Sequence, residues 1–165
     1  MPKKTKVEEV EKSENQEVNT KELAADNIVK NTMLWTTGVG LVPIPVVDLV
    51  AVTGLQLNML RRICKVYEVK FFKNTAKNII GSLLGGLFPS TLSRPAAGLI
   101  KMIPLVGPTI GAVTMPIFSG ASTYAVGRVF IKHFESGGTL LSFCRKKAKK
   151  EFEEALREGQ KVPAT

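Results

Sequence analysis

The chain has very few of the side chains that build catalytic, metal or disulfide sites. Its two cysteines, Cys64 and Cys144, lie eighty positions apart with no CxxC pair, so we expect reduced thiols in a reducing compartment. The single histidine, His133, has no second His, Cys or Asp at ligand spacing. The sequence also lacks the GxxxxGKS/T, GxGxxG and GxSxG motifs of P-loop, dinucleotide and hydrolase sites. We therefore predict that the protein is not an enzyme and binds no cofactor.

Acidic side chains are scarce in the middle of the chain. Residues 49–134 hold one acid, Glu68, against ten bases. Two groups of cations stand out: Arg61, Arg62, Lys65, Lys70, Lys73 and Lys77, followed by Arg145, Lys146, Lys147, Lys149 and Lys150. Such groups can meet anionic lipid or an acidic partner, or form a solvated helix face. Aromatic residues make up 7% and are not interleaved with the bases, so we expect no nucleic acid.

Two long blocks are nearly free of charge. Residues 31–60 carry only Asp48 and are broken by Pro43-Ile44-Pro45, which predicts a helix, a sharp turn and a second helix. Residues 78–127 carry only Arg94 and Lys101. Because a spanning helix needs about 20 apolar residues, the first block suits one span or a short hairpin that returns to the same side, and the second suits two spans. The alternative is burial in a soluble helical core.

Asp48 would be costly deep inside a bilayer without a partner. We predict that it forms a buried ion pair with Arg94 or Arg128. The alternative is that its carboxylate accepts hydrogen bonds from helix N–H groups. Small residues also recur four apart, a spacing that lets helices pack closely. They are Gly81 and Gly85, Gly107 and Gly111, and then Ser119, Thr123 and Gly127.

These patterns predict an all-α fold with five to six helices, which form two apolar hairpins and an amphipathic C-terminal helix. Residues 1–19 are too polar to offset the entropy of ordering, so we expect a disordered charged arm. Residues 20–138 form the apolar helical domain, residues 139–158 the amphipathic helix and residues 159–165 a tail. Within the domain we predict the following helices: 20–38, 45–67, 74–89, 90–103 and 109–135.

Two blocks of the sequence resemble a known family. One runs from Ala25-Asp26-Asn27-Ile28-Val29-Lys30-Asn31 through Gly40-Leu41-Val42-Pro43-Ile44-Pro45-Val46-Val47-Asp48, and the other covers residues 119–139. They resemble the uncharacterised bacterial domain family numbered six hundred and ninety-seven among domains of unknown function. The resemblance implies that the domain often follows an Era-like or dynamin-like GTPase domain, and that it occurs in YcjF-like inner-membrane proteins. It implies no catalytic residues. Because this sequence has no P-loop, any tie to a GTPase would act in trans.

We therefore expect a non-enzymatic, membrane-associated helical module at the bacterial inner membrane, facing the cytoplasm. Its two cationic groups would meet anionic lipid or a partner. A GTPase and a second copy of the chain are the candidate protein partners. The alternative is a soluble helical adaptor or oligomer that binds an acidic protein through its basic face.

Overall fold

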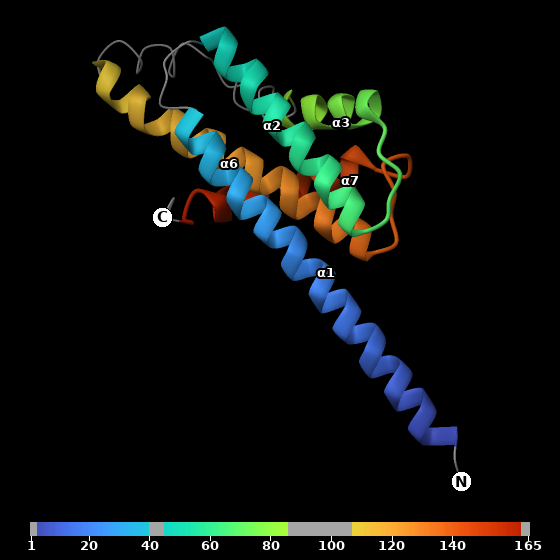
Figure 1. Ribbon diagram of the computed structural model, residues 1–165. Coiled ribbons are helices and arrows are strands. Elements are labelled where there is room, and N and C mark those ends of the chain that lie inside the picture. The colour runs from blue at the N-terminus through green and yellow to red at the C-terminus, as the bar shows by residue number, and fades with distance from the viewer. Residues whose placement is uncertain (1–2, 40–44, 86–106, 163–165) are drawn as a thin grey trace.

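The computed structural model describes residues 3–39, 45–85 and 107–162, with side chains over 11–38, 51–85 and 117–162. These parts contain five helices and no strand (Figure 1): α1 (Lys3–Val39), α2 (Pro45–Val66), α3 (Lys73–Gly85), α6 (Gly107–Glu135) and α7 (Arg145–Gly159). The all-α prediction is confirmed.

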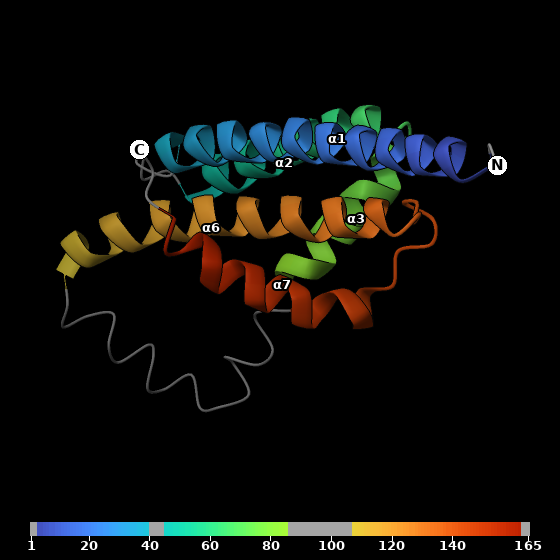
Figure 2. The ribbon, with the colours of Figure 1, turned by 90° about the horizontal axis from the view of Figure 1, so that it is seen from below.

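Helix α6 is the centre of the bundle and contacts the other four helices. Figure 2 shows α7 on one side of α6 and α1 with α2 on the other. Helix α3 contacts α2, α6 and α7 and so links the two sides. The sequence explains the central place of α6, because its long apolar stretch from 107 to 127 has no charged face to turn toward water.

Four hydrogen bonds between helices define their directions: Gln56–Thr123, Tyr67–Glu135, Asp26–Arg128 and Ser119 to the Thr36 carbonyl. The first two follow the same order along α2 and α6, so these helices run the same way. The last two follow opposite orders along α1 and α6, so α1 is antiparallel to both.

An apolar core fills the end of the bundle where α2 and α6 finish and α7 begins, which we call the polar end because its outer surface is charged. Its fully buried side chains include Leu60, Ile63, Ile80, Phe130, Ile131, Leu140 and Phe152. The ring of Phe130 stacks on Phe143 with 4.8 Å between centroids, and Tyr67 packs against Phe134 at 5.8 Å. These aromatic contacts hold the loop before α7 and the end of α2 against the same part of α6.

The predicted helices agree with the structure in the middle of the chain and differ at its C-terminal end. Helices α2, α3 and α6 lie where the sequence places them, whereas the helix predicted over 90–103 lies outside the described residues. Gly137, with φ of 77°, ends α6 as expected. Helix α7 begins later than predicted, because Ser142 accepts the N–H of Thr139 at 2.8 Å in a local turn. Leu141, which lies within the helix predicted over 139–158, is instead in the loop before α7 and is 72% exposed.

The N-terminal arm is helical, which corrects the prediction of disorder over residues 1–19. Helix α1 begins at Lys3 and projects well beyond the bundle (Figure 1), and every residue from 11 to 20 is exposed. Thr20, expected to begin a helix, lies inside one and donates its hydroxyl to the Gln16 carbonyl at 2.8 Å. Extending a packed helix outward requires no new nucleus. The Glu17–Lys21 ion pair at 2.8 Å adds support in the favourable order.

Candidate functional site

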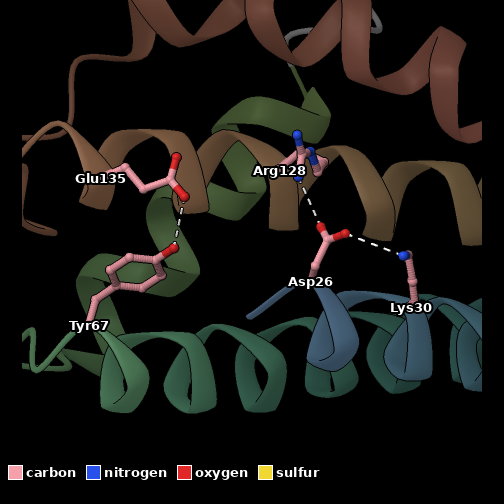
Figure 3. Close-up of polar contacts among 5 residues, drawn as sticks. All are labelled: Asp26, Lys30, Tyr67, Arg128 and Glu135. Atoms are coloured by element: carbon pink, nitrogen blue, oxygen red, sulfur yellow. Dashed lines mark hydrogen bonds and ion pairs between the residues drawn. The ribbon is translucent and has the colours of Figure 1, made fainter. Parts of the chain in front are cut away.

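Charged side chains on the three long helices stop at one level of the bundle. The Arg128 guanidinium lies 2.9 Å from one carboxylate oxygen of Asp26, and the Lys30 ammonium lies 3.4 Å from the other (Figure 3). Gln56 of α2 contacts Thr123 of α6, and the two helices run in the same direction. Arg61 lies five residues after Gln56, and Arg128 lies five residues after Thr123, so Arg61 is level with Arg128. We call this level the charge boundary; its members are Asp26, Lys30, Arg61, Arg62 and Arg128.

Beyond the charge boundary lies an end of the bundle whose three long helices are almost free of charge. It comprises residues 31–39 of α1, 45–60 of α2 and 107–127 of α6, among which only Asp48 is charged, and the end of α7 reaches it, since Gly159 lies against Ala121 and Tyr124 and Glu158 faces Tyr124. We call it the charge-poor end. At 1.5 Å per residue, the three segments extend about 14, 24 and 31 Å beyond the boundary.

The described interior of the charge-poor end mixes polar with apolar side chains, among the latter Met33, Met59 and Val126. Six hydroxyl or amide side chains are buried there: Thr32, Thr36, Gln56, Ser119, Ser122 and Thr123. The Gln56 amide donates to the Thr123 hydroxyl at 3.1 Å, joining α2 to α6. The Ser119 hydroxyl donates to the Thr36 carbonyl at 3.3 Å, joining α6 to α1. The other amide atom of Gln56, its Oε1, is buried with no hydrogen-bond partner among the described residues.

The described outer surface of the same end exposes large apolar side chains beside the polar Asn31 and Asn58. Trp35 is 71% exposed, and it lies on the part of α1 that also supplies the buried Thr32 and Thr36. Further large apolar side chains on this end are exposed: Leu34 (43%), Ile117 (46%) and Phe118 (39%). The two ends of the bundle therefore differ. At one end an apolar core lies under charged residues, and at the other buried hydroxyls lie among apolar side chains under an exposed tryptophan and phenylalanine.

Helices α1 and α6 approach closely at two glycines. A Cβ built on Gly127 would lie 2.8 Å from Cγ1 of the buried Val29, and one built on Gly120 would collide with the Thr37 hydroxyl. The predicted row of small residues is confirmed on α6, where Ser119, Thr123 and Gly127 are all buried. Small residues and hydroxyls between helices are typical of packing in lipid, and they also occur in soluble bundles.

Both predicted cationic groups lie at or near the polar end, and all their members are exposed. We call the first group the basic corner: Arg61, Arg62, Lys65, Lys70, Lys73 and Lys77. None of the six forms an ion pair within the described residues, and the Lys70 ammonium lies 5.5 Å from the Phe72 ring centroid. In the second group, Lys149 and Lys150 pair with Glu153 and Glu154 at 4.0 and 3.9 Å.

The Tyr67 hydroxyl, beside the basic corner, donates to the Glu135 carboxylate at 3.0 Å (Figure 3). Burial and the neighbouring carboxylate raise the pKa of Tyr67, so the phenol stays a neutral donor. This bond ties the end of α2 to the end of α6 and holds the basic corner in place.

A hollow of about 400 Å³ beside the start of α7 contains the residues closest to a reactive set: His133, Ser142, Cys144 and Lys147. The His133 ring is engaged by the Thr139 carbonyl, with Nε2 at 2.9 Å from the oxygen. The backbone N–H groups of Lys147 and Lys146 lower the pKa of the exposed Cys144 thiol. Among the described residues no group of three His, Cys, Asp or Glu side chains could hold a metal ion.

The sequence predicted an ion pair of Asp48 with Arg94 or Arg128, and the structure describes only one of these three side chains, that of Arg128. The partner of Arg128 in the structure is Asp26. Arg94 and the side chain of Asp48 lie outside the described residues, so their pair stays a prediction. Asp26 was not singled out from the sequence; its spacing of four from Lys30 was the available signal.

The described helices were compared with the requirements for crossing a membrane. Across 3–39, 45–85 and 107–162, no helix combines the length and apolar character that crossing a bilayer requires, so the spanning alternative predicted from the sequence is not found there.

Comparison with known proteins gives one family and one relative. Residues 4–159 match the family described as "Domain of unknown function (DUF697)". "Magnetosome membrane protein 22" of Magnetospirillum gryphiswaldense is 32% identical over 145 residues, which cover 87% of this chain and 74% of the relative. No solved structure matches the chain. Because the family match covers nearly the whole chain, as the resemblance of the two sequence blocks implied, this protein belongs to the DUF697 family.

Proposed function

We propose that the protein is a non-enzymatic, membrane-associated helical module whose charge-poor end enters one lipid leaflet from the cytoplasmic side of a bacterial inner membrane. The observation that carries this proposal is the exposed apolar surface of the charge-poor end, which lies over buried hydroxyls. In water, exposing Trp35 and Phe118 is unfavourable, whereas the buried hydroxyls need no water because they are hydrogen-bonded within the bundle. In lipid, the same arrangement places apolar groups against acyl chains and satisfies polar groups internally.

The α1 part of the charge-poor end has the depth of one leaflet. The hydrocarbon core of a bilayer is about 30 Å thick, so one leaflet offers about 15 Å. The α1 segment beyond the charge boundary is about 14 Å long, whereas the longer α2 and α6 segments would have to lie inclined by about 50–60°, more than the usual tilt of helices in a membrane. This depth needs no spanning helix.

The charge boundary would then lie at the headgroups. Lys30, Arg61 and Arg62 are exposed at this level, and each basic residue near an anionic surface contributes about 1 kcal/mol of attraction. Arg128 and Asp26 neutralise one another nearby, so their charges do not oppose insertion. The name of the relative, a membrane protein of the magnetosome, supports membrane association in general.

The single tryptophan of the chain tests the proposal directly, because Trp35 lies on the outer surface of the charge-poor end. The full chain is mixed with vesicles of phosphatidylglycerol and phosphatidylethanolamine. We expect the Trp35 emission to shift to the blue and to be quenched by brominated acyl chains. The protein should float with the vesicles after a high-salt wash, because buried apolar area does not depend on salt.

A matched control moves the reporter to the polar end. In a Trp35→Phe, Leu141→Trp variant the tryptophan replaces a side chain that is equally exposed, 72% against 71%, but far from the charge-poor end. Its emission should stay that of a solvated indole. Flotation that salt reverses, with no shift at Trp35, would reduce the proposal to surface binding, and no flotation would overturn it.

We propose as a second candidate a soluble adaptor that receives an acidic protein, such as a GTPase acting in trans, at its cationic groups. The observation that favours it is the lack of ion pairs at the basic corner and at Arg145, Lys146 and Lys147 within the described residues. A monodisperse species without detergent that makes no contact with vesicles would favour this adaptor over the membrane module.

A further inference from the structure

One section of the projecting part of α1 carries the charge opposite to that of the basic corner. Residues 7–17, which we call the acidic arm, hold five glutamates against a single lysine, Lys12, and follow three lysines, Lys3, Lys4 and Lys6. Glu11 and Glu14 are exposed and form no ion pair within the described residues, whereas Glu17 pairs with Lys21. In the described part of the arm, Glu11 and Glu14 therefore present negative charge to solvent along a helix.

The acidic arm has an electrostatic reason to find a cationic surface. Glu8, Glu11, Glu14 and Glu17 follow one another at every third position, so like charges are neighbours along the helix and weaken it. No other part of the described chain packs against residues 11–19, which are exposed throughout. A row of lysines and arginines opposite these glutamates would relieve the repulsion and stabilise the helix.

The basic corner of the same molecule is out of reach of the arm. Helix α1 passes the corner at Lys21, whose ammonium lies 3.8 Å from the Glu68 carboxylate, and then continues away from the bundle (Figure 1). At 1.5 Å per residue, Glu8 lies about 20 Å beyond Lys21. A continuous helix cannot fold back over this distance, so any contact between arm and corner joins two molecules.

We propose that the acidic arm docks on the basic corner of a second copy of the chain. Each copy carries both surfaces, so the contact can be made twice about a two-fold axis and closes into a dimer. Charge complementarity selects this occupant, since the arm supplies carboxylates and the corner supplies six exposed cations without a carboxylate partner in the described structure. This dimer does not require that the charge-poor end enters a membrane.

Charge reversal on the full chain tests the dimer. The arm variant is Glu11→Lys with Glu14→Lys, and the corner variant is Lys73→Glu with Lys77→Glu. All four positions are exposed, and Lys73 begins α3, where a carboxylate suits the helix dipole, so both variants should fold. Sedimentation equilibrium in about 50 mM salt, where screening is weak, should show dimeric wild type and dimerisation on the order of tenfold weaker or more for each variant.

Mixing the two variants is the decisive arm of the experiment. In the mixed dimer the unchanged arm of the corner variant meets the unchanged corner of the arm variant, which restores one wild-type contact. In the other contact the substituted positions of the arm and of the corner carry exchanged charges, so a one-to-one heterodimer should form in preference to either homodimer. The matched control, Lys146→Glu with Lys147→Glu, makes the same change of charge at the start of α7 and should leave the wild-type dimer intact. A monomeric wild type, a mixture that stays monomeric, or a control that dissociates equally would overturn the proposal.

Discussion

Gln56 is the residue at which the polar interior of the charge-poor end is least satisfied. Its amide nitrogen donates to Thr123, but its Oε1 is buried without a hydrogen-bond partner among the described residues. An unsatisfied buried acceptor costs about 1–3 kcal/mol, which offsets what the bond to Thr123 contributes. This side chain therefore adds little net stability, although it joins α2 to α6.

We predict that Gln56→Leu changes the free energy of unfolding by less than about 1 kcal/mol, because it removes the hydrogen bond to Thr123 and the unsatisfied amide oxygen together. Gln56→Ala should cost about 2 kcal/mol or more, because it also leaves a cavity. Chemical denaturation followed by circular dichroism measures both. Equal losses for the two variants would show that the amide itself is required.

The two cysteines should differ sharply in reactivity. Backbone N–H groups at the start of α7 lower the pKa of the exposed Cys144 thiol, whereas burial raises the pKa of Cys64 to about 11. Since the thiolate is the reactive form, iodoacetamide near neutral pH should modify Cys144 at least about tenfold faster than Cys64. Mass spectrometry of labelled peptides measures the rates. The Cys144→Ser variant should lose the fast phase, and equal rates in the wild type would contradict the assignment.

At the scale of helices, the close approach of α1 and α6 rests on the absence of a side chain at Gly127. A Cβ there would meet Cγ1 of Val29 at 2.8 Å, and Val29 is fully buried. We predict that Gly127→Ala lowers the free energy of unfolding by about 1–3 kcal/mol through overpacking.

Two further variants check this explanation of Gly127. Adding Val29→Ala to Gly127→Ala should recover part of the loss, because the colliding methyl groups are gone. Gly81→Ala on α3, where nothing lies within 4 Å of the new Cβ, should instead add about 0.5–1 kcal/mol through helix propensity. The explanation fails if Gly127→Ala is as stable as the wild type.

The whole molecule divides into a packed bundle and a projecting arm, and these should separate experimentally. We predict that deleting residues 1–16 lowers the far-ultraviolet helical signal and changes the free energy of unfolding of the bundle by less than about 0.5 kcal/mol. The deletion keeps the Glu17–Lys21 pair, and residues 11–16 are exposed. An unchanged helical signal would mean that the arm is not helical in solution, and a large loss of stability would mean that it contacts the bundle.

The charge boundary is a property of the whole molecule, because it depends on charges of α1, α2 and α6 that lie at one level of the bundle. Arg61 and Arg62 belong both to this boundary and to the basic corner, so the proposed contact with lipid and the proposed contact between copies share these two residues. The acidic arm takes part only in the second contact.

The sequence by itself determined the helices and most of their ends. Helix ends are set by local backbone preferences, which do not depend on distant residues: α2 begins at Pro45, and α6 ends just before Gly137. The prediction of disorder over residues 1–19 was wrong because it rested on composition alone. Composition shows that these residues cannot form a core, but a helix that is already formed in the bundle can extend outward through them. The late start of α7 was missed for a similar reason, since the turn at Thr139 and Ser142 competes locally with the helix.

Only the tertiary structure decided what the charge-poor blocks form together. The spacing of Ser119, Thr123 and Gly127 was visible in the sequence, but not that Gln56 of α2 and Thr36 of α1 would face them. Nor could the sequence choose Asp26 as the partner of Arg128, since the two lie far apart along the chain. The physical reason is that burial and pairing depend on which helices pack together. Whether a hydroxyl points inward or a tryptophan outward is therefore set by the bundle.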